Sequence, residues 1–445
     1  MKFPSQIFRS YDIRGLLDEV TPELAKNVGY VLIKKTQAKT VIAGRDMRAT
    51  SPELLKAAIQ GLIEAGANVI DIGFCTTSLY NFCISSIDHA EAGIMITASH
   101  NPAEYNGMKF SYGNGQPISG KEIRDAVEED FVPAGSLGSV TKIDPINDYV
   151  EKCLTVSGAP DLSGKKIVVD YGNGAGAITV RPLLQKMNVE VIELYAEPDA
   201  SFPNHESNPV KEETLVDIKA AILREKADLG IALDGDADRI MFIDNEGVTL
   251  RGDLLVPLLA KELRSHEPEA KIVITVNQSW TSFEEIAACG APAIVCPNGR
   301  TNVIATMKKE NADFGGEVSG HMMYKEFADL ESVDYTIVRT LSVWQKSGLV
   351  FADLVRHLRQ YHNSGEVNLE IHDKDGAIKK LEELYASKAT VVNRIDGIRC
   401  EFDHDWWFIA RLSNTEPILR LTVEAVSEGL MREKVEELVV IVSEK

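Results

Sequence analysis

Short apolar runs alternate along the chain with longer segments of mixed apolar and polar residues, and the alternation repeats. An apolar run at 41–43 is followed by a mixed segment that begins at Ser51-Pro52 and stops at Gly66, and then by a second run at 68–72. A serine before a proline is typical of a helix N-terminus, and a glycine is typical of a helix end. The pattern therefore predicts a strand, a helix and a second strand.

The same order returns twice further along the chain. The second copy runs from 166 to 192 and contains the glycine-rich turn 172–176, and the third copy runs from 271 to 295. Repeated strand–helix–strand units are typical of α/β proteins. The repetition predicts three related α/β domains with mixed sheets.

Each copy is later followed by one more apolar run that leads into a polar loop. The three loops are residues 97–102, 234–239 and 315–321. Open α/β sheets place their chemistry at strand ends of this kind. If the three domains share one architecture, the loops occupy equivalent strand ends, and we expect them to converge on a central cleft.

Polar, turn-forming segments divide the chain, and its last part differs from the rest. A hairpin around 403–405 is followed by a polar loop, a strand and an amphipathic helix over 430–442. This order predicts a smaller C-terminal α+β domain. We therefore expect four domains, with the boundaries 1–145, 146–246, 247–363 and 364–445.

The charge balance narrows the class of partner. The chain has 445 residues, 47 of them Lys or Arg and 67 Asp or Glu, which gives a formal charge of -20. Such a surface argues against nucleic acid or an anionic membrane as the principal partner. An anionic ligand would have to be captured by local basic groups.

Cysteines and apolar runs indicate the compartment. The six cysteines are scattered, without a Cys-x-x-Cys pair or a zinc-like spacing, which predicts reduced thiols. The start has no apolar signal core, and no apolar run is long enough to span a bilayer. We expect a soluble cytoplasmic protein.

Ser99 is a candidate nucleophile. It follows the apolar run 93–96, which reads as a short buried strand, so its hydroxyl is expected on a loop at a strand end. The alternative is a hydroxyl that caps a turn before Pro102.

Asp234, Asp236 and Asp238 alternate along one loop and are candidate ligands of a cation. Three hard oxygen donors suit Mg²⁺ or Ca²⁺. An EF-hand is excluded, because Arg239 and Asn245 stand where its Gly and Glu would be. A solvated acidic turn is the alternative, but three clustered carboxylates repel one another unless something neutralises them. Magnesium shared with a phosphate, to which Arg239 also binds, is the favoured interpretation.

Two further loops offer polar groups for a sugar phosphate. Arg411, Ser413, Asn414 and Thr415 combine a guanidinium, hydroxyls and an amide, a set that suits a phosphate dianion. The alternative is a self-capped hairpin loop. Glu317 and Ser319 would point to one side of an extended segment and bind two adjacent hydroxyls, although singly each could be an ordinary surface residue. His321 is a candidate acid or base, with a structural histidine as the alternative.

Six segments, in order along essentially the whole chain, carry a resemblance to a known family. They are 8–15 (FRSYDIRG), 97–102 (TASHNP), 106–109 (NGMK), 234–239 (DGDADR), 316–321 (GEVSGH) and 411–417 (RLSNTEP). With these segments the chain resembles the α-D-phosphohexomutases, in particular the phosphomannomutase/phosphoglucomutase branch. The resemblance implies three α/β domains and a C-terminal domain around a central cleft, in agreement with the repeats.

The resemblance implies a reaction through a phosphorylated serine. Ser99 would carry a phosphoryl group, and Mg²⁺ bound by Asp234, Asp236, Asp238 and the phosphorylated Ser99 would neutralise it. A sugar phosphate would take this group and become a hexose 1,6-bisphosphate, which turns around and returns its other phosphate to Ser99. Hexose 6-phosphate and hexose 1-phosphate are thereby interconverted, with mannose as the first expected sugar and glucose as the second.

The resemblance also implies roles for the other motif residues. Proton transfer would fall to Lys109, with His321 and Arg14 nearby, and the choice among them is open. The implied catalytic residues are Ser99, Lys109, His321, Arg14 and His100. The implied substrate-binding residues are Tyr11, Arg239, Arg300, Glu317, Ser319, Arg411, Ser413, Asn414 and Thr415. Closure of the fourth domain is expected to exclude water from the phosphoserine.

Two positions depart from the bifunctional members of the family, and they leave the substrate open. Where those members carry a lysine and a histidine that contact substrate, this chain has Asn277 and Arg300. A phosphoglucosamine mutase and a non-catalytic sugar-phosphate-binding protein are the alternatives. A serine hydrolase fits less well, because Gly-x-Ser-x-Gly is absent and His100 is poorly placed as a base for Ser99. A monomer or a homodimer is expected.

Overall fold

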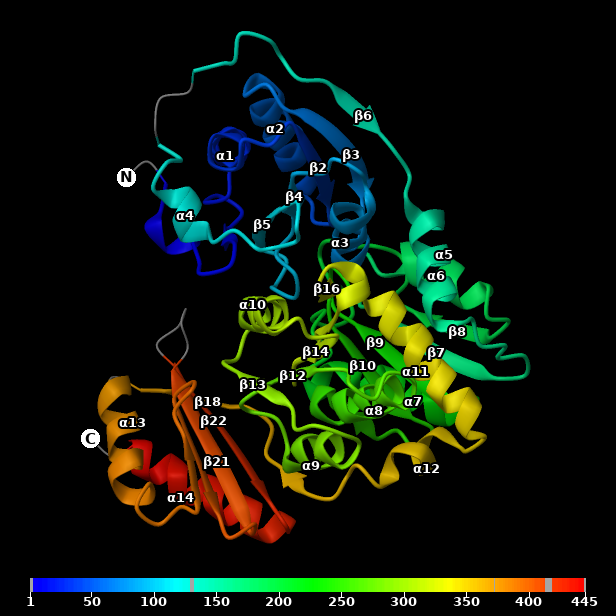
Figure 1. The fold of residues 1–445 in the computed structure, drawn as a ribbon, viewed down its shortest axis with the longest axis vertical. Coiled ribbons are helices and arrows are strands. Elements are labelled where there is room, and N and C mark those ends of the chain that lie inside the picture. Colours follow the sequence, from blue (N-terminus) through cyan, green and yellow to red (C-terminus); the bar gives the residue numbers. More distant parts are fainter. Residues whose placement is uncertain (1–2, 129–131, 372, 413–417, 444–445) are drawn as a thin grey trace. The chain divides into compact units, whose positions relative to one another are not determined.

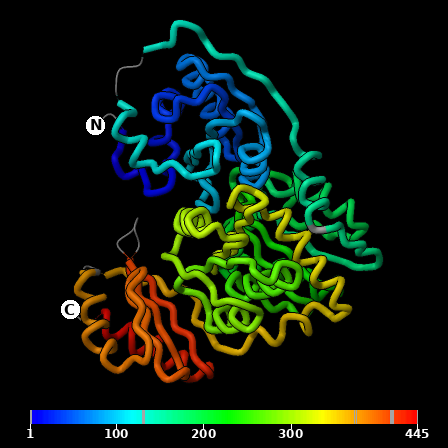
Figure 2. Tube along the Cα trace, viewed as in Figure 1, coloured from blue at the N-terminus to red at the C-terminus, as the bar shows by residue number. Residues whose placement is uncertain are grey.

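The computed structural model describes residues 3–128, 132–371, 373–412 and 418–443 (Figure 1). Two compact units divide these residues. The first unit contains residues 1–252 and 319–354, and the second contains 253–318 and 355–445. Each unit therefore combines separate parts of the chain, as the colours in Figure 2 show.

A mixed six-stranded sheet forms the N-terminal part of the first unit. The strand order is β1 (Ile13–Leu16), β5 (Tyr105–Tyr112), β4 (Ala92–Ile96), β2 (Thr40–Arg45), β3 (Asn68–Phe74) and β6 (Val140–Lys142). β2 pairs in parallel with β3 and β4, whereas β5 runs antiparallel to β4 and β1. The helices of this part are α1 (Pro22–Thr36), α2 (Ser51–Glu64), α3 (Thr77–Ser86) and α4 (Gly120–Arg124), with the 3-10 turn η1 (Ser5–Ile7).

Helices cover both faces of this sheet because its strands are apolar on both sides. Val41 and Ala43 pack into one core with α1 and α2, whereas α3 lies on the opposite face, where a Cβ at Gly93 would come within 2.3 Å of the Tyr80 hydroxyl. α1 and α2 approach so closely that a Cβ at Gly61 would lie 1.9 Å from a main-chain oxygen of α1. Ser51 is the first residue of α2 and not its N-cap, which is Thr50.

A second mixed sheet completes the first unit. Its strand order is β11 (Thr249–Leu250), β10 (Ile240–Asp244), β9 (Leu229–Leu233), β7 (Lys166–Asp170) and β8 (Glu190–Leu194). The remaining elements are α5 (Ile146–Ser157), α6 (Ala177–Gln185), η2 (Glu212–Leu215), α7 (Val216–Glu225), β15 (Met322–Tyr324), η3 (Lys325–Phe327), β16 (Leu330–Glu331) and α11 (Val333–Ser347). β7 pairs in parallel with β8 and β9, and β10 is antiparallel. The chain passes between the units within α8 (Gly252–His266) and α12 (Phe351–Arg356).

The second unit combines a parallel sheet with an antiparallel one. β12 (Ile272–Thr275) pairs in parallel with β13 (Ile294–Cys296) and β14 (Phe314–Gly316), near α9 (Trp280–Ala288) and α10 (Arg300–Glu310). The antiparallel strands are β17 (His362–Asn363), β18 (Val367–Glu370), β22 (Ile418–Ala425), β21 (Trp406–Leu412), β20 (Ile398–Phe402) and β19 (Val391–Asn393). α13 (Lys374–Tyr385) and α14 (Glu428–Ser443) pack on one face of this sheet (Figure 1).

Two further observations concern the thiols and the helices. All six cysteines are free, and five of them are buried. In the described part of the chain, no helix combines the length and the apolar content that a membrane span requires.

Candidate active site

Ser99 lies in a tight turn directly after β4, at the strand end where the sequence predicts it. It is 3% exposed, and its φ of 51° lies in the left-handed region, which costs a residue with a side chain about 1–2 kcal/mol. The Ser99 main-chain N–H donates to Thr97 Oγ1 at 2.9 Å. The surrounding contacts therefore hold this residue in a conformation that it would not adopt alone.

The Ser99 hydroxyl faces the first aspartate of the acidic loop. Ser99 Oγ donates to Asp234 Oδ2 at 3.0 Å and lies 3.2 Å from His100 Nδ1. Burial lowers the pKa of His100 well below its usual range, and the nearby Arg239 and Arg14 lower it further. A candidate nucleophile and a candidate metal ligand, distant in sequence, are thus in direct contact.

The acidic loop follows β9 as a compact turn. The main-chain N–H groups of Asp238 and Arg239 donate to Asp234 Oδ1 at 3.0 and 3.1 Å, and Ala237 has a φ of 52°. One oxygen each of Asp234, Asp236 and Asp238 lies within 4.8 Å of the others, and all three residues are buried. The turn therefore brings the three carboxylates to one place.

Hydroxyl groups at the start of α3 and directly after β4 anchor this loop. Asp236 Oδ2 accepts from Thr77 Oγ1 at 2.7 Å and from Thr97 Oγ1 at 3.0 Å. The Thr77 N–H donates to the main-chain oxygen of Asp236 at 2.7 Å, and Ser78 Oγ donates to that of Ala237 at 2.8 Å. Sequence reasoning missed Thr77 and Ser78, whose one signal is a cluster of hydroxyl residues at the start of a helix.

Lys109 neutralises part of the negative charge of the three aspartates. Lys109 Nζ lies 2.8 Å from Asp236 Oδ2 and 2.6 Å from Asp238 Oδ2. Burial raises the pKa of Asp234, and Asp238 and Asp236 raise it further. Burial also acts to raise the pKa of Asp238, but Lys109 and His321 outweigh it and hold that pKa well below its usual range.

The donor set fits a metal ion. Asp236 Oδ1 is buried and has no hydrogen-bond partner among the described residues. Three carboxylates on one small cluster repel one another, and oxygen donors of this kind are the ligands that hard divalent cations prefer. Asp234, Asp236 and Asp238 could therefore hold a metal ion.

The third polar loop reaches the same cluster through its last residues. His321 Nε2 lies 3.2 Å from Asp238 Oδ1 and 3.4 Å from Arg239 Nε. His321 Nδ1 lies 2.9 Å from Ser319 Oγ. The first unit thus brings together Ser99, Lys109, His321, Ser319 and Arg239 around the three aspartates.

The N-terminal motif supports the Ser99 loop. Arg14 donates to Asn101 Oδ1 and to Asp12 Oδ2, both at 2.6 Å. Burial acts to lower the pKa of Arg14, but Asp12 outweighs it and the pKa is raised. Tyr11 is half-buried in the bend before β1.

The second unit holds the remaining predicted residues. Glu317, which is 6% exposed, accepts from the Gly299 N–H at 3.0 Å, and Arg300 begins α10 directly afterwards. Arg411 pairs with Glu366 at 2.5 Å. Ser413, Asn414 and Thr415 lie outside the described residues.

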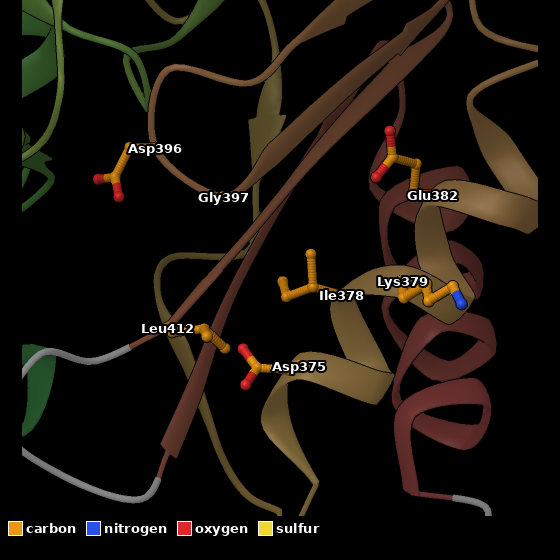
Figure 3. A pocket seen from close by; sticks show the side chains of 7 residues that line it. All are labelled: Asp375, Ile378, Lys379, Glu382, Asp396, Gly397 and Leu412. Atoms are coloured by element: carbon orange, nitrogen blue, oxygen red, sulfur yellow. The ribbon is translucent and has the colours of Figure 1, made fainter.

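A cavity of about 300 Å³ lies in the C-terminal domain (Figure 3). It is lined by Asp375, Ile378, Lys379, Glu382, Asp396, Gly397 and Leu412. Carboxylates outnumber cations in this lining, so it does not match a phosphate dianion. We therefore do not assign the phosphate site to this cavity.

Comparisons with known proteins agree with the fold and with the motifs. Family models described as phosphoglucomutase/phosphomannomutase alpha/beta/alpha domains I, II and III match residues 5–132, 147–247 and 251–361, and the C-terminal domain model matches 366–440. A curated relative from Xanthomonas campestris, named "Phosphohexose mutases", is 35% identical over 96% of each chain. A phosphomannomutase from Escherichia coli is 34% identical over 94% of each chain.

A solved structure has the same architecture. The phosphoglucomutase/phosphomannomutase family protein from Burkholderia thailandensis has a TM-score of 0.91 and 28% identity, and the match covers 99% of this chain and 97% of the other. The predicted fold class, three α/β domains with mixed sheets and a smaller C-terminal domain, is confirmed. The chain belongs to the phosphoglucomutase/phosphomannomutase family, within the α-D-phosphohexomutases.

Proposed function

We propose that the protein is a phosphohexomutase that interconverts hexose 6-phosphate and hexose 1-phosphate through a phosphorylated Ser99, with mannose as its first substrate and glucose as its second. The observation that carries the proposal is the 3.0 Å contact between Ser99 Oγ and Asp234 Oδ2, inside a buried group of three aspartates. A hydrolase would need a base aligned on the serine through its own hydrogen bonds. His100 Nδ1 lies 3.2 Å from Ser99 Oγ, but the serine hydroxyl donates to Asp234, within a carboxylate cluster suited to a cation.

Three aspartates would hold a metal ion beside the phosphoryl group. Asp234, Asp236 and Asp238 would hold Mg²⁺ next to phosphorylated Ser99, where the ion would neutralise the phosphate and polarise its phosphorus. A phosphoserine carries about -1.5 to -2 charges near neutral pH, which three unshielded carboxylates would repel. The orphaned Asp236 Oδ1 supports this assignment.

The transfer conserves one phosphoryl group on the enzyme. A free sugar hydroxyl attacks the phosphorus of phosphoserine, so the new sugar O–P bond forms as the bond to Ser99 Oγ breaks. The hydroxyl gives up its proton, and Ser99 regains one. The hexose 1,6-bisphosphate then turns around, and Ser99 Oγ attacks its other phosphate. Added bisphosphate would phosphorylate an idle enzyme and act as an activator.

We assign the proton transfer to Lys109 and His321, both of which contact Asp238. Arg14 orders the Ser99 loop through Asn101. His100, held neutral, lies beside Ser99 Oγ without adding charge to the cluster.

The remaining predicted residues would bind the sugar phosphate. Glu317 and Ser319 are proposed to bind ring hydroxyls that both orientations of the sugar present. The phosphate that does not react would be held by Arg411, Ser413, Asn414 and Thr415, with further contacts from Tyr11, Arg239 and Arg300. A guanidinium presents parallel N–H donors to a phosphate, and Arg411 has an ion pair with Glu366 that a stronger anion can replace.

Phosphorus NMR tests the proposal directly. Mannose, glucose and glucosamine 1-phosphates are incubated in turn with the protein, Mg²⁺ and a trace of hexose 1,6-bisphosphate. We expect conversion to the 6-phosphate, fastest with mannose. Conversion of the glucosamine ester alone would identify a phosphoglucosamine mutase. Binding without conversion, and no phosphoryl adduct on Ser99 by intact-mass measurement, would identify a non-catalytic binder and contradict the proposal.

The setting of the enzyme is also part of the proposal. Five buried free thiols support a reducing cytoplasmic compartment. We propose a monomer or a homodimer, which sedimentation of the purified protein will decide.

A further inference from the structure

The Ser99 loop is built around the guanidinium of Arg48, a residue outside the six motif segments. Arg48 is 1% exposed. Its Nη1 donates to the main-chain oxygens of Pro102 and Tyr105, both at 2.8 Å. Its Nη2 donates to those of Ser99 at 2.9 Å and Asn101 at 2.5 Å. One side chain thus satisfies several main-chain acceptors between residues 99 and 105.

Arg48 is itself fixed from several sides. Its Nε lies 3.2 Å from Asp46 Oδ2, and Asp46 Oδ1 accepts from the Arg48 N–H at 3.0 Å and from Ser51 Oγ at 2.7 Å. The guanidinium carbon lies 5.3 Å from the centre of the Phe202 ring. A planar cation with this many contacts has one orientation available to it.

The Ser99 main-chain oxygen links this arrangement to the chemistry. A Cβ at Gly235 would lie 2.8 Å from that oxygen, so the Ser99 carbonyl is confined between Arg48 and the acidic loop. The orientation of the peptide after Ser99, together with its left-handed φ of 51°, sets the direction in which the side chain leaves the backbone. That direction brings Ser99 Oγ to Asp234.

We propose that Arg48 is a positioning residue that holds the Ser99 loop in its left-handed turn and thereby aims the serine oxygen at the carboxylate cluster. Arg48 touches neither the reacting atoms nor the substrate groups assigned above. The inference rests on the proposed mutase function, because in that function the direction of the Ser99 side chain affects catalysis. Phosphoryl transfer needs the attacking and leaving oxygens roughly in line.

Arg48→Lys tests the inference, because lysine keeps the charge but offers one nitrogen where arginine offers a fork of donors. We expect kcat to fall about 100-fold, the effect of a misplacement of about 1 Å. KM for the hexose phosphate should change by less than about twofold, because uniform substrate binding is untouched. Amide hydrogen exchange in residues 97–106 should become about tenfold faster.

Arg264→Lys is the matched control. Arg264 is also buried and donates to the main-chain oxygens of Ala270, Ile286 and Ala291 at 3.0, 2.6 and 2.7 Å, but it lies in the second unit. The Arg264→Lys variant should lower the Tm as much as Arg48→Lys does. Its kcat and the amide exchange of residues 97–106 should stay at wild-type values. If both variants lose only stability, Arg48 is merely structural and the inference is wrong.

A milder variant covers the case in which Arg48→Lys fails to fold. Ser51→Ala removes the hydroxyl that holds Asp46 and should lower kcat about threefold, with faster exchange in 97–106. Unchanged values for both would overturn the inference. The two proposals fail separately. A wild-type protein without mutase activity refutes the function, whereas the exchange comparison still decides whether Arg48 holds the loop.

Discussion

The two units hold their proposed functional residues in very different ways. In the first unit, Ser99 and the three aspartates are at most 3% exposed, and each has hydrogen bonds to neighbouring segments of that unit. In the second unit, the Arg411 side chain is 17% exposed and pairs with Glu366. The groups proposed to react are thus held in one arrangement, whereas the arginine proposed to bind phosphate pairs with a glutamate that it could exchange for another anion.

Ser99→Ala should have the largest effect, because it removes the proposed nucleophile from the buried cluster of the first unit. Removal of the nucleophile should lower kcat by about 1,000-fold or more. The Kd for hexose phosphate by calorimetry should stay within about twofold, because none of the proposed substrate-binding residues is changed. Wild-type turnover in a folded Ser99→Ala protein would disprove the phosphoserine proposal.

Asp236→Asn should come next, because it removes charge from the proposed metal site. We expect a loss of about 100-fold in kcat and the loss of any Mg²⁺-dependent rise in Tm. The metal readout separates this variant from simple misfolding. Wild-type protein treated with a chelator serves as the control without metal. If Mg²⁺ raises the Tm of the variant and of the wild type equally, the proposed metal site is wrong.

Arg411→Lys tests the arginine of the second unit that pairs with Glu366. Lysine keeps the charge but loses the paired N–H donors that suit phosphate. KM should rise about tenfold with a smaller change in kcat, since the loss of a charged hydrogen bond costs roughly 1.5–3 kcal/mol. Arg420→Lys, which alters the other arginine that pairs with Glu366, is the control. Equal effects of the two substitutions would argue against a special role for Arg411.

Asp334→Asn should have the smallest effect on turnover, and it acts instead on the stability of the first unit. Burial raises the pKa of Asp334 to about 6, so between pH 4 and pH 6 the folded chain binds a proton that the unfolded chain has lost. Stability from this group is therefore present below pH 4 and is lost as the pH rises to 6. Between pH 4 and pH 7, the free energy of unfolding of the variant should rise by up to about 3 kcal/mol relative to that of the wild type. A denaturation series at several pH values checks this, and parallel pH profiles would contradict it.

The sequence predicted the elements that rest on local patterns. The apolar run before Ser99, the one before the aspartates and the hairpin around 403–405 all appear as expected. Each depends on strand periodicity or turn residues, which neighbouring positions determine. The functional roles of the site residues and the domain boundaries stay predictions.

Contacts between distant segments could not be predicted in this way. Thr77, Ser78 and Arg48 reach the site through hydrogen bonds to main-chain oxygens of remote loops. Such acceptors exist at every residue and leave no pattern in the sequence. Ser51 shows the same effect, because it bonds Asp46 and leaves the N-cap position to Thr50.

The first unit combines separate parts of the chain, and this affects its folding during synthesis on the ribosome. Tyr149, on α5, donates to Asp334 Oδ2 at 3.0 Å and lies 2.8 Å from Ser332 Oγ, so an early helix is completed by partners encoded far downstream. As the chain leaves the ribosome, the hydroxyl of Tyr149 cannot form these two contacts until Ser332 and α11 have emerged. Ribosome-bound chains that end before residue 319 should therefore remain open to protease in the α5 region, even though the serine and aspartate loops have already been synthesised.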